Sequence, residues 1–439
     1  MFLNIFSNKV SHLIIAFIYS YLFYRGYLDF LYPTFEYMGY GIIENRFNNE
    51  FLFFLSLIIS IIPINFFKGI NQISSFLCVF IYYILYVPII ITYFFDLEGS
   101  DLYLVYQQLL FMSGMILLIL ADRIKIKKSI VINSNIDILK ILFISTITIV
   151  LYIVIVYNKN LKFVSFEDVY EQRSSNQDFG KSNLLGYFFA WLSNALIPIL
   201  LAYGLFSKRN FFFIIGTFAS VIVYMATAAK SVLTFPVVIF VIYFVLKRKN
   251  LNLSLPFIGI IFSFIFIIII NLEFNVLSSL FMMRTVGNGG SLTKHYHDFF
   301  IDNPHTYYSH INIINFFTRS YPYNEDALGQ VVGKEYWSDD MNANANFWAT
   351  DGIAALGDLG ILFSSFLLFI VFIIFNNISR NYNKLFLVLI LIPYLFSLLN
   401  TSLFSSILTG GAFIVFFFLS FKSIKNNNFI NENSYNIRS

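Results

Sequence analysis

The sequence predicts an all-α polytopic membrane protein, and its composition, the length of its apolar runs and the placement of its charges each support this prediction. Of its 439 residues, 58% are hydrophobic and 12% are charged, which is about half the charged fraction of a soluble domain. Apolar runs without charge recur along the chain at a length that crosses a bilayer. The only cysteine, Cys78, lies inside one of these runs, so a disulfide framework is excluded.

We expect twelve membrane-spanning helices. No charged residue occurs from 385 to 421, which is too long for one span, and "NTS" at 400–402 marks a turn between two spans. The eighth span is short, and Lys230 and Lys247 at its ends can extend to the interfaces. The expected spans lie at about 10–30, 51–67, 71–95, 102–121, 138–157, 184–206, 210–228, 232–246, 254–273, 350–375, 384–399 and 403–421.

The basic residues orient these spans with both termini in the cytoplasm. In this arrangement the cytoplasmic segments hold 17 of the 28 basic residues and 3 of the 24 acidic residues. Short loops such as "KRKN" and "SKRN" then fall inside, as the positive-inside rule requires. A shift by one span anywhere would destroy this segregation, so the charges support the count.

The chain is expected to form one transmembrane bundle over residues 1–421, followed by a disordered cytoplasmic tail over 422–439. The bundle includes long outer loops at 158–183 and 274–349, besides a shorter outer segment at 31–50. A segment as long as 274–349 inside a compact protein is usually functional.

The long loop 274–349 is rich in aromatic residues, among them Trp337 and Trp348. Flat aromatic faces with polar edges suit sugar rings and lipid headgroups. An ordinary aromatic belt at the membrane interface explains the same composition without a ligand.

Four cations of the outer segments are candidates for binding a pyrophosphate: Arg173, Lys230, Arg284 and Arg319. The planar guanidinium of arginine matches phosphate oxygens, and lysine offers a point charge. Lys230 and Arg284 lie close to span ends, so we expect them at headgroup depth. Snorkelling or anchoring of the topology explains these positions equally well.

Four of the five histidines fall within residues 284–310: His295, His297, His305 and His310. "HYH" places two imidazoles two positions apart, and on a strand both would face one way. The sequence offers no spaced third group of ligands, so we expect no metal and favour a general base or a surface polar role. Nucleotide-binding loops and a serine-hydrolase elbow are missing from the sequence, and we expect no nucleic-acid partner.

The stretch 329–361 closes the long loop and opens the tenth span. Small residues that permit close helix approach lie at its end: Gly352, Gly357 and Gly360. Amides that can hydrogen-bond to sugar hydroxyls alternate before it: Asn342, Asn344 and Asn346.

Four stretches together resemble the O-antigen polymerases, the Wzy-type oligosaccharide repeat-unit polymerases. They are "VYEQR" followed by "GYFFAW" and Pro198, the Lys-Ser pair after the seventh span, "R…GGSLT…Y.DFF…P.T..SH" in the long loop, and "NANF…G…G" before the tenth span. The resemblance covers about residues 165–361 by motif and the whole chain by topology. It departs from the family in one respect, because no glycine falls eleven positions after Arg173, Arg284 or Arg319.

The resemblance implies a GT-C-like bundle in the bacterial cytoplasmic (inner) membrane that transfers glycan from undecaprenyl pyrophosphate to a lipid-linked repeat unit. The donor is already activated, so no cofactor and no metal are expected. The implied partners are undecaprenyl-pyrophosphate-linked oligosaccharides, membrane lipids, a chain-length regulator and a flippase. The implied residue roles are catalysis by Arg284, His310, Arg319 and Glu325, and substrate binding by Arg173, Lys230, Tyr296 and Asn346.

Two other functions fit the same architecture. An O-antigen ligase uses the same kind of donor with a lipid A core acceptor. A lipid-linked oligosaccharide flippase also tends to twelve spans, but it needs charges inside the spans along a cavity and no long ordered outer loop. The expected spans are nearly free of charge, which favours the polymerase.

Overall fold

The computed structural model describes residues 9–126, 132–134, 137–165, 168, 172, 176, 183–247, 254–271, 279–324 and 326–423. The chain divides into two compact units. Unit 1 comprises Met1–Lys125, Asn252–Ile374 and Leu398–Leu403, and unit 2 comprises Ile126–Leu251, Phe375–Ser397 and Phe404–Ser439. The expectation of one bundle stays a prediction, and 424–439 of the expected tail lies outside the described residues.

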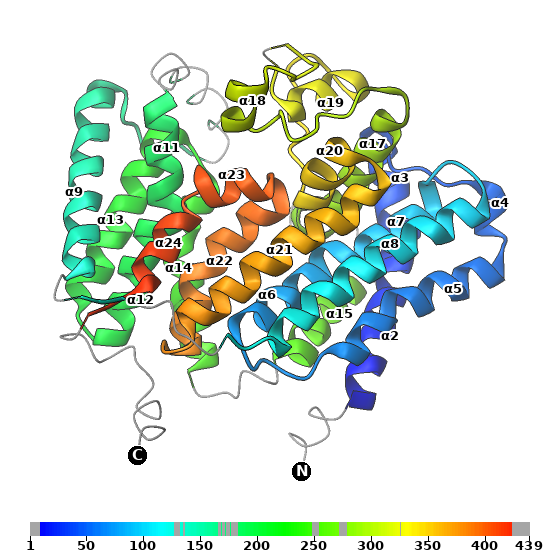
Figure 1. Ribbon diagram of the computed structural model, residues 1–439, viewed down its shortest axis with the longest axis horizontal. Helices are drawn as coiled ribbons and strands as arrows, with labels where there is room; N and C mark the ends of the chain where they lie inside the picture. Colours follow the sequence, from blue (N-terminus) through cyan, green and yellow to red (C-terminus); the bar gives the residue numbers. More distant parts are fainter. Residues whose placement is uncertain are drawn as a thin grey trace. The chain divides into compact units, whose positions relative to one another are not determined.

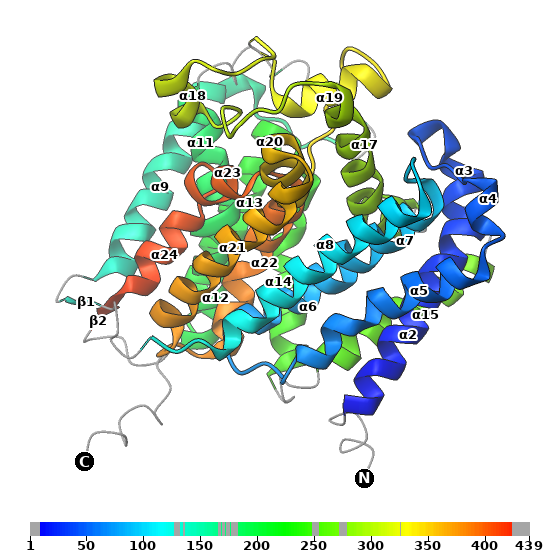
Figure 2. The same ribbon diagram turned by 45° about the vertical axis from the view of Figure 1, so that its right-hand side comes forward.

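Unit 1 is helical, and its helices α5, α7 and α8 pack side by side (Figure 1, Figure 2). Its first segment contains α2 (Lys9–Gly26), η1 (Tyr27–Leu31), α3 (Tyr32–Phe35), η2 (Glu36–Met38), α4 (Glu44–Phe47), α5 (Glu50–Ile61), η3 (Ile62–Phe66), α6 (Ile73–Ile81), η4 (Tyr82–Tyr86), α7 (Val87–Asp96), α8 (Asp101–Leu120) and η5 (Ala121–Arg123). Its second segment contains α15 (Ser254–Asn271), η10 (Ser279–Gly287), α17 (Asn288–Asp302), α18 (Asn312–Thr318), α19 (Leu328–Tyr336), η11 (Trp348–Ile353), α20 (Ala354–Leu356) and most of α21 (Asp358–Ser379).

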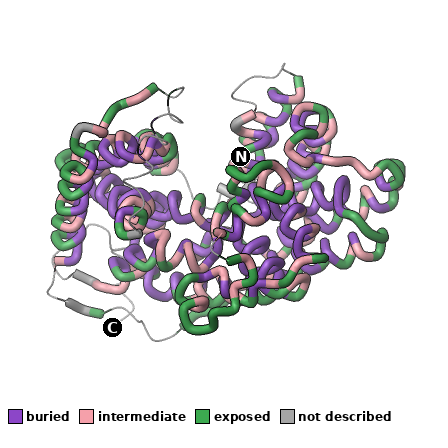
Figure 3. Tube along the Cα trace, turned by 90° about the horizontal axis from the view of Figure 1, so that it is seen from above, coloured by how far each residue is buried: buried purple, intermediate pink, exposed green. Residues whose placement is uncertain are grey.

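Unit 2 is also helical, apart from a parallel pairing of two three-residue strands, β1 (Ile132–Ser134) and β2 (Phe421–Ser423). Figure 3 shows buried positions recurring along the helices of the chain. The helical elements of unit 2 are α9 (Ile138–Tyr157), η6 (Asn158–Asn160), α11 (Asn183–Trp191), η8 (Leu192–Leu196), α12 (Ile197–Ser207), α13 (Asn210–Thr227), α14 (Lys230–Leu246), most of α22 (Lys384–Asn400), most of α23 (Leu403–Leu408) and α24 (Ala412–Ser420).

Apolar helices occur at most of the positions where spans are expected. Among the described residues, six are long and apolar enough to cross a membrane: Ile73–Asp96, Asp101–Arg123, Ile138–Tyr157, Leu184–Ser207, Asn210–Thr227 and Asp358–Ser379. Shorter apolar helices lie at Glu50–Phe66, Lys230–Leu246, Ile258–Asn271 and Lys384–Asn400. The prediction of a helical membrane protein is therefore supported by the length and composition of these helices.

Prolines explain why some of these helices widen without breaking. Pro33, Pro88 and Pro198 each follow a π-helical turn, namely η1, η4 and η8. A proline in a helix lacks the N–H of the ordinary i→i−4 bond, and its ring collides with that carbonyl group. A wider turn moves the carbonyl aside. The helices Ile73–Asp96 and Leu184–Ser207 therefore continue through their prolines.

The expected tenth and twelfth spans are wrong in their extent. A short buried helix over 348–356, made of η11 and α20 and called the half-helix below, ends at Gly357 with φ +66°, and α21 begins only at Asp358. In the last expected span, α23 and α24 are separated at 409–411, where Gly411 has φ +89°. Glycine reaches this left-handed region without the steric penalty of a side chain.

Two glycines hold the half-helix close to α21. A Cβ atom added at Gly360 would lie 2.0 Å from the carbonyl oxygen of Gly352. This confirms the close helix approach predicted at these glycines.

The expected outer loop 274–349 is largely helical and belongs to unit 1. η10 and α17 form one continuous helix that packs along η4 and α7. A Cβ atom added at Gly289 would meet Leu85, and Lys294 reaches Asp96. Gly289 lies beside Leu85, and the later residue Lys294 lies beside the later residue Asp96. The residue numbers therefore increase in the same direction on both helices, and α17 runs parallel to α7.

Candidate functional site

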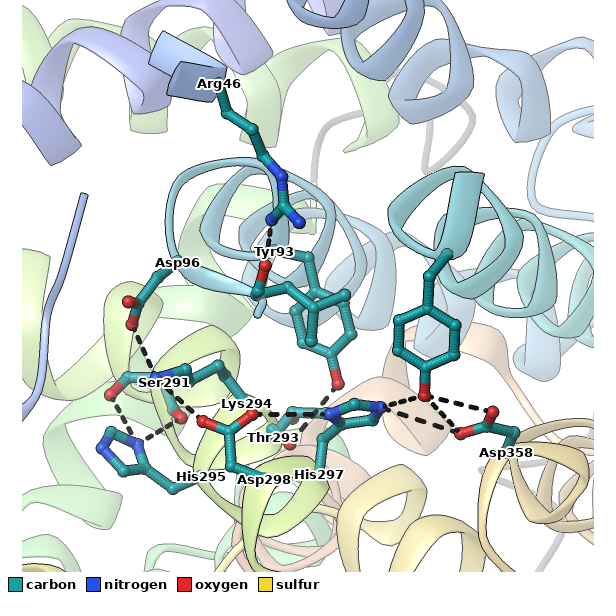
Figure 4. Close-up of polar contacts among 12 residues, drawn as sticks. Arg46, Tyr93, Asp96, Ser291, Thr293, Lys294, His295, His297, Asp298 and Asp358 are labelled. Carbon is teal, nitrogen blue, oxygen red and sulfur yellow. Dashed lines mark hydrogen bonds and ion pairs between the residues drawn. The ribbon is translucent and has the colours of Figure 1, made fainter. Parts of the chain in front are cut away.

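A network of ionisable side chains joins α17 to the end of α7 (Figure 4). The ammonium group of Lys294 lies 2.8 Å from Asp298 Oδ2 and 3.3 Å from Asp96 Oδ2. Lys294 and Asp298 are four residues apart on α17, a spacing that places them on one helix face. The loop after Asp96 is held by Arg46, whose guanidinium donates hydrogen bonds to the carbonyl groups of Leu97 and Gly99.

The network continues from Asp298 through a histidine to α8 and α21. His297 Nδ1 lies 3.5 Å from Asp298 Oδ1, and His297 Nε2 lies 2.8 Å from the Tyr103 hydroxyl. The same hydroxyl lies 3.4 and 3.3 Å from the two carboxylate oxygens of Asp358. Side chains from four helices therefore meet within unit 1: the consecutive helices α7 and α8, and the distant helices α17 and α21.

The network lies where three candidate membrane spans end. Asp96 is the last residue of Ile73–Asp96, Tyr103 is the third residue of Asp101–Arg123, and Asp358 is the first residue of Asp358–Ser379. Ionisable groups gathered at the ends of apolar helices are expected near a membrane surface, because charges are costly in the hydrocarbon core.

Opposite charges in the network stabilise the ionised forms of their neighbours. Burial alone would raise the pKa of Asp298, but the nearby His297 ring and the charge of Lys294 lower it overall. Burial alone would lower the pKa of Lys294, but the carboxylates of Asp96 and Asp298 raise it overall. Asp298 and Lys294 are therefore ionised at neutral pH.

His295 does not belong to this network, although it is two residues from His297. The segment is helical and not a strand, and residues two apart on a helix point to different sides. His295 Nδ1 lies 2.7 Å from the Ser291 carbonyl oxygen, and its ring packs against Tyr336 and Trp337. Burial lowers the pKa of His295 to about 4, so the buried ring is neutral near pH 7.

Acidification is expected to destabilise the fold through His295. Between its ordinary pKa of 6.5 and its folded pKa of about 4, the unfolded chain binds more protons than the folded chain. The free energy of unfolding therefore falls by about 2–4 kcal/mol as the pH drops through this range. Thermal unfolding in detergent at pH 7 and at about pH 4.5 measures the loss. His295→Gln, which does not titrate, should show a smaller loss, and an unchanged loss would contradict the assignment.

A second buried polar cluster surrounds Asp351 in the half-helix. The Asp351 side chain is fully buried, and it accepts hydrogen bonds from the Ser402 hydroxyl at 2.7 Å and the Leu403 amide at 2.6 Å. His310 Nε2 lies 3.7 Å from Asp351 Oδ1, and His310 Nδ1 lies 2.9 Å from the Thr306 hydroxyl oxygen. Asp351 thus ties the half-helix to the turn before α23.

The turn that carries His310 caps the end of the half-helix. The backbone amides of Thr306 and Tyr307 donate to the carbonyl groups of Ala354 and Ala355. This turn places Tyr307 and Tyr308 in the left-handed region, at φ 46° and 65°, where residues other than glycine are uncommon.

Two predicted binding residues, and Trp348 of the aromatic-rich loop, are buried and make structural contacts. Tyr296 is fully buried and donates a hydrogen bond to the Ala343 carbonyl group at 3.0 Å. Asn346 is fully buried, and its side-chain oxygen accepts from the Trp348 amide at 3.0 Å and caps the half-helix. The Trp348 ring is buried and donates to the Ser365 hydroxyl. None of these side chains offers a surface to a sugar.

Arg284 is exposed on η10, which packs beside another helix of unit 1. Its segment η10 packs against η4, and Phe281 contacts Phe262 and Phe266 inside α15. Arg284 therefore lies beside the middle of the helix Ile73–Asp96 rather than directly beyond the end of α15. The expectation that Arg284 lies at headgroup depth stays a prediction.

Arg284 and His297 also do not share one site. They are 13 residues apart on one helix, which corresponds to about 20 Å and to roughly opposite faces.

Two other predicted residues are exposed at helix ends: Arg319 at the end of α18, with φ 48°, and Lys230 at the start of α14 in unit 2. Arg173 and Glu325 lie outside the described residues. His310, predicted as a base, has a side chain that is only 4% exposed, so a substrate does not reach it in this structure.

Sequence reasoning did not connect the acidic members of the network. Asp96 follows the third expected span together with Glu98 and Asp101, and acids are common in the expected outer segments. Asp358 lies inside the expected tenth span, 350–375. The usable signal was this position, because an ionisable residue within a span often marks a functional site.

No group of three or more histidine, cysteine, aspartate or glutamate residues arranged for a metal ion occurs in the described part of the chain. Comparison of the sequence and structure with protein-family models, curated proteins and solved structures finds no match. The fold and the network together define a helical membrane protein with an ionisable site at the ends of its apolar helices.

Proposed function

We propose that the chain is a glycosyltransferase that polymerises oligosaccharide repeat units carried on undecaprenyl pyrophosphate. The observation that carries this proposal is the network at the ends of three apolar helices, where Lys294, Asp298 and His297 connect Asp96, Tyr103 and Asp358. A reaction on a lipid-linked substrate requires a proton acceptor close to the membrane surface. The motif resemblance to Wzy-type polymerases supports the same function.

The proposal includes the topology derived from the charges. Twelve spans with both termini in the cytoplasm place the network on the outer face of the bacterial cytoplasmic membrane, in a GT-C-like arrangement. Six long apolar helices and several shorter ones support a multi-pass protein. A flippase would deliver the repeat units to this face, and a chain-length regulator would set the length of the product.

Purified full-length protein in liposomes provides the test, first with an undecaprenyl-pyrophosphate-linked oligosaccharide as the only substrate and then with lipid A core added as a second acceptor. We expect a ladder of products that differ by one repeat unit, together with release of undecaprenyl pyrophosphate. Transfer only to added lipid A core would identify a ligase instead. No covalent product from either acceptor would remove glycosyl transfer from consideration.

A flippase remains a second candidate because of Arg284. A flippase needs charged residues within its spans, and Arg284 is a charged residue beside the middle of an apolar helix. Charges at such positions commonly mark substrate pathways. A fluorescent lipid-linked oligosaccharide in the same liposomes distinguishes the two, because a flippase would move it between leaflets without changing its length.

A further inference from the structure

We propose that Asp358 is the general base of the transfer reaction and that Tyr103 and His297 pass its proton towards Asp298. This inference rests on the function proposed above. The carboxylate comes from α21, the hydroxyl from α8 and the imidazole from α17, and they form one continuous chain of polar contacts (Figure 4).

Accessibility selects Asp358 within this chain. Its side chain is 31% exposed, whereas that of Asp298 is 19% exposed and that of His297 is 2% exposed. A general base has to come within hydrogen-bond distance of the group that it deprotonates. A substrate hydroxyl can therefore reach Asp358, while His297 stays behind it.

The distances also give the direction of proton movement. Tyr103 has one hydroxyl proton, and its oxygen is closer to His297 Nε2, at 2.8 Å, than to the Asp358 oxygens, at 3.3 and 3.4 Å. When that proton points to His297, the carboxylate of Asp358 keeps its lone pairs free. The Asp298 carboxylate, 3.5 Å from His297 Nδ1, favours a proton on that nitrogen, which leaves Nε2 as the acceptor.

The charges around His297 favour a proton on its ring. Asp96 and Asp298 in their ionised forms carry two negative charges around the single positive charge of Lys294. Burial raises the pKa of Asp96 to about 6, so near neutral pH this carboxylate is largely ionised and a net negative charge remains. The ring of His297 lies 3.5 Å from Asp298 and 3.7 Å from Asp358, so a proton on His297 is held between two carboxylates and offsets part of this charge.

The reaction step balances with these groups alone. The acceptor hydroxyl oxygen forms a bond to the anomeric carbon while the bond from that carbon to the pyrophosphate oxygen breaks, and the electron pair leaves with the undecaprenyl pyrophosphate. The hydroxyl proton moves to Asp358. It then passes to the Tyr103 oxygen as Tyr103 gives its own proton to His297 Nε2, which restores the carboxylate. Asp358 is the catalytic residue, and Tyr103 and His297 are positioning residues.

Steady-state kinetics of the full-length protein in liposomes test this assignment with the undecaprenyl-pyrophosphate-linked oligosaccharide. Asp358→Asn keeps the shape of the side chain but cannot accept the proton, so kcat should fall by about 10²–10⁴ with little change in KM. Asp358→Glu should recover part of the rate. Tyr103→Phe should lower kcat by less than Asp358→Asn does, again with little change in KM.

Asp302→Asn is the matched control, since Asp302 is an exposed carboxylate at the end of α17, and it should keep the wild-type rate. Wild-type kcat in Asp358→Asn, with the wild-type protein active, would overturn the base assignment and leave the proposed function standing. If Asp358→Asn does not fold, full rates in both Asp358→Glu and Tyr103→Phe would overturn it. An inactive wild-type protein would instead count against the proposed function.

Discussion

Arg284→Ala is expected to weaken substrate binding, raising KM for the lipid-linked oligosaccharide by about 10- to 100-fold, the cost of about 1.5–3 kcal/mol for losing a hydrogen bond to a charged group. Arg284 is an exposed cation beside the middle of the helix Ile73–Asp96, and it forms no ion pair with another described residue. A charge in such a position is costly without an anionic partner. On the function proposed above, we infer that this partner is the pyrophosphate of the acceptor lipid, which stays intact in the reaction and need not lie beside Asp358.

The separation of Arg284 from the network decides which kinetic constant should change. About 20 Å along one helix lies between Arg284 and His297, so Arg284 does not contact the group that leaves at Asp358. Its substitution should therefore act on KM and leave kcat within a few-fold of the wild type. Arg284→Lys should recover only part of the affinity, because a point charge does not reproduce the two parallel hydrogen bonds of a guanidinium.

Glu273→Gln is the control for Arg284, because Glu273 is a nearby acid in the sequence that lies outside the described residues. If Glu273 were the partner of Arg284, its substitution would reproduce the effect of Arg284→Ala. Equal affinity of the wild-type protein and Arg284→Ala would show that the cation only anchors the helix.

The helical architecture was accessible from the sequence because it depends on local properties. A charge-free apolar run has few alternatives to a helix in a membrane, so the expected positions of most spans match helices. Gly357 and Gly411 were harder to interpret, because a glycine in an apolar run is compatible both with close packing and with a break. The structure shows close packing at Gly360 and breaks at the other two.

The candidate site was less accessible because it depends on contacts between distant segments. The sequence directed attention to segment 284–310, which carries part of the network, but singled out Arg284, Tyr296 and His310 within it. Their neighbours Lys294, His297 and Asp298 acquire their importance only from Asp96, Tyr103 and Asp358, which are brought to them by three other helices. Periodicity and composition carry no information about such pairings.

The same reason explains why the amides and aromatic residues were misjudged. Asn346 and Trp348 suit a sugar by their chemistry, and equally suit a helix cap and a buried ring. In the structure Asn346 caps the half-helix and the Trp348 ring is buried, because the half-helix packs against α21 and encloses both side chains.

Asp351→Ala is expected to destabilise unit 1 by about 3–5 kcal/mol, the cost of removing one partner of a buried polar cluster. The substitution leaves the Ser402 hydroxyl and the Leu403 amide without their acceptor, and it removes the carboxylate that faces His310. Buried donors without a partner pay their full desolvation penalty. Thermal and denaturant unfolding of the purified protein in detergent should both report the loss.

A double-mutant cycle separates the contact from a general effect of the substitution. Ser402→Ala alone should cost less than Asp351→Ala, and the combined variant should be more stable than the sum of the two losses predicts, because the serine hydroxyl no longer lacks its acceptor. Asp340→Ala, at an exposed position of the same segment, should change the free energy of unfolding by less than about 0.5 kcal/mol. A loss below about 1 kcal/mol in Asp351→Ala, or strict additivity with Ser402→Ala, would mean that this cluster does not hold the half-helix to the turn before α23.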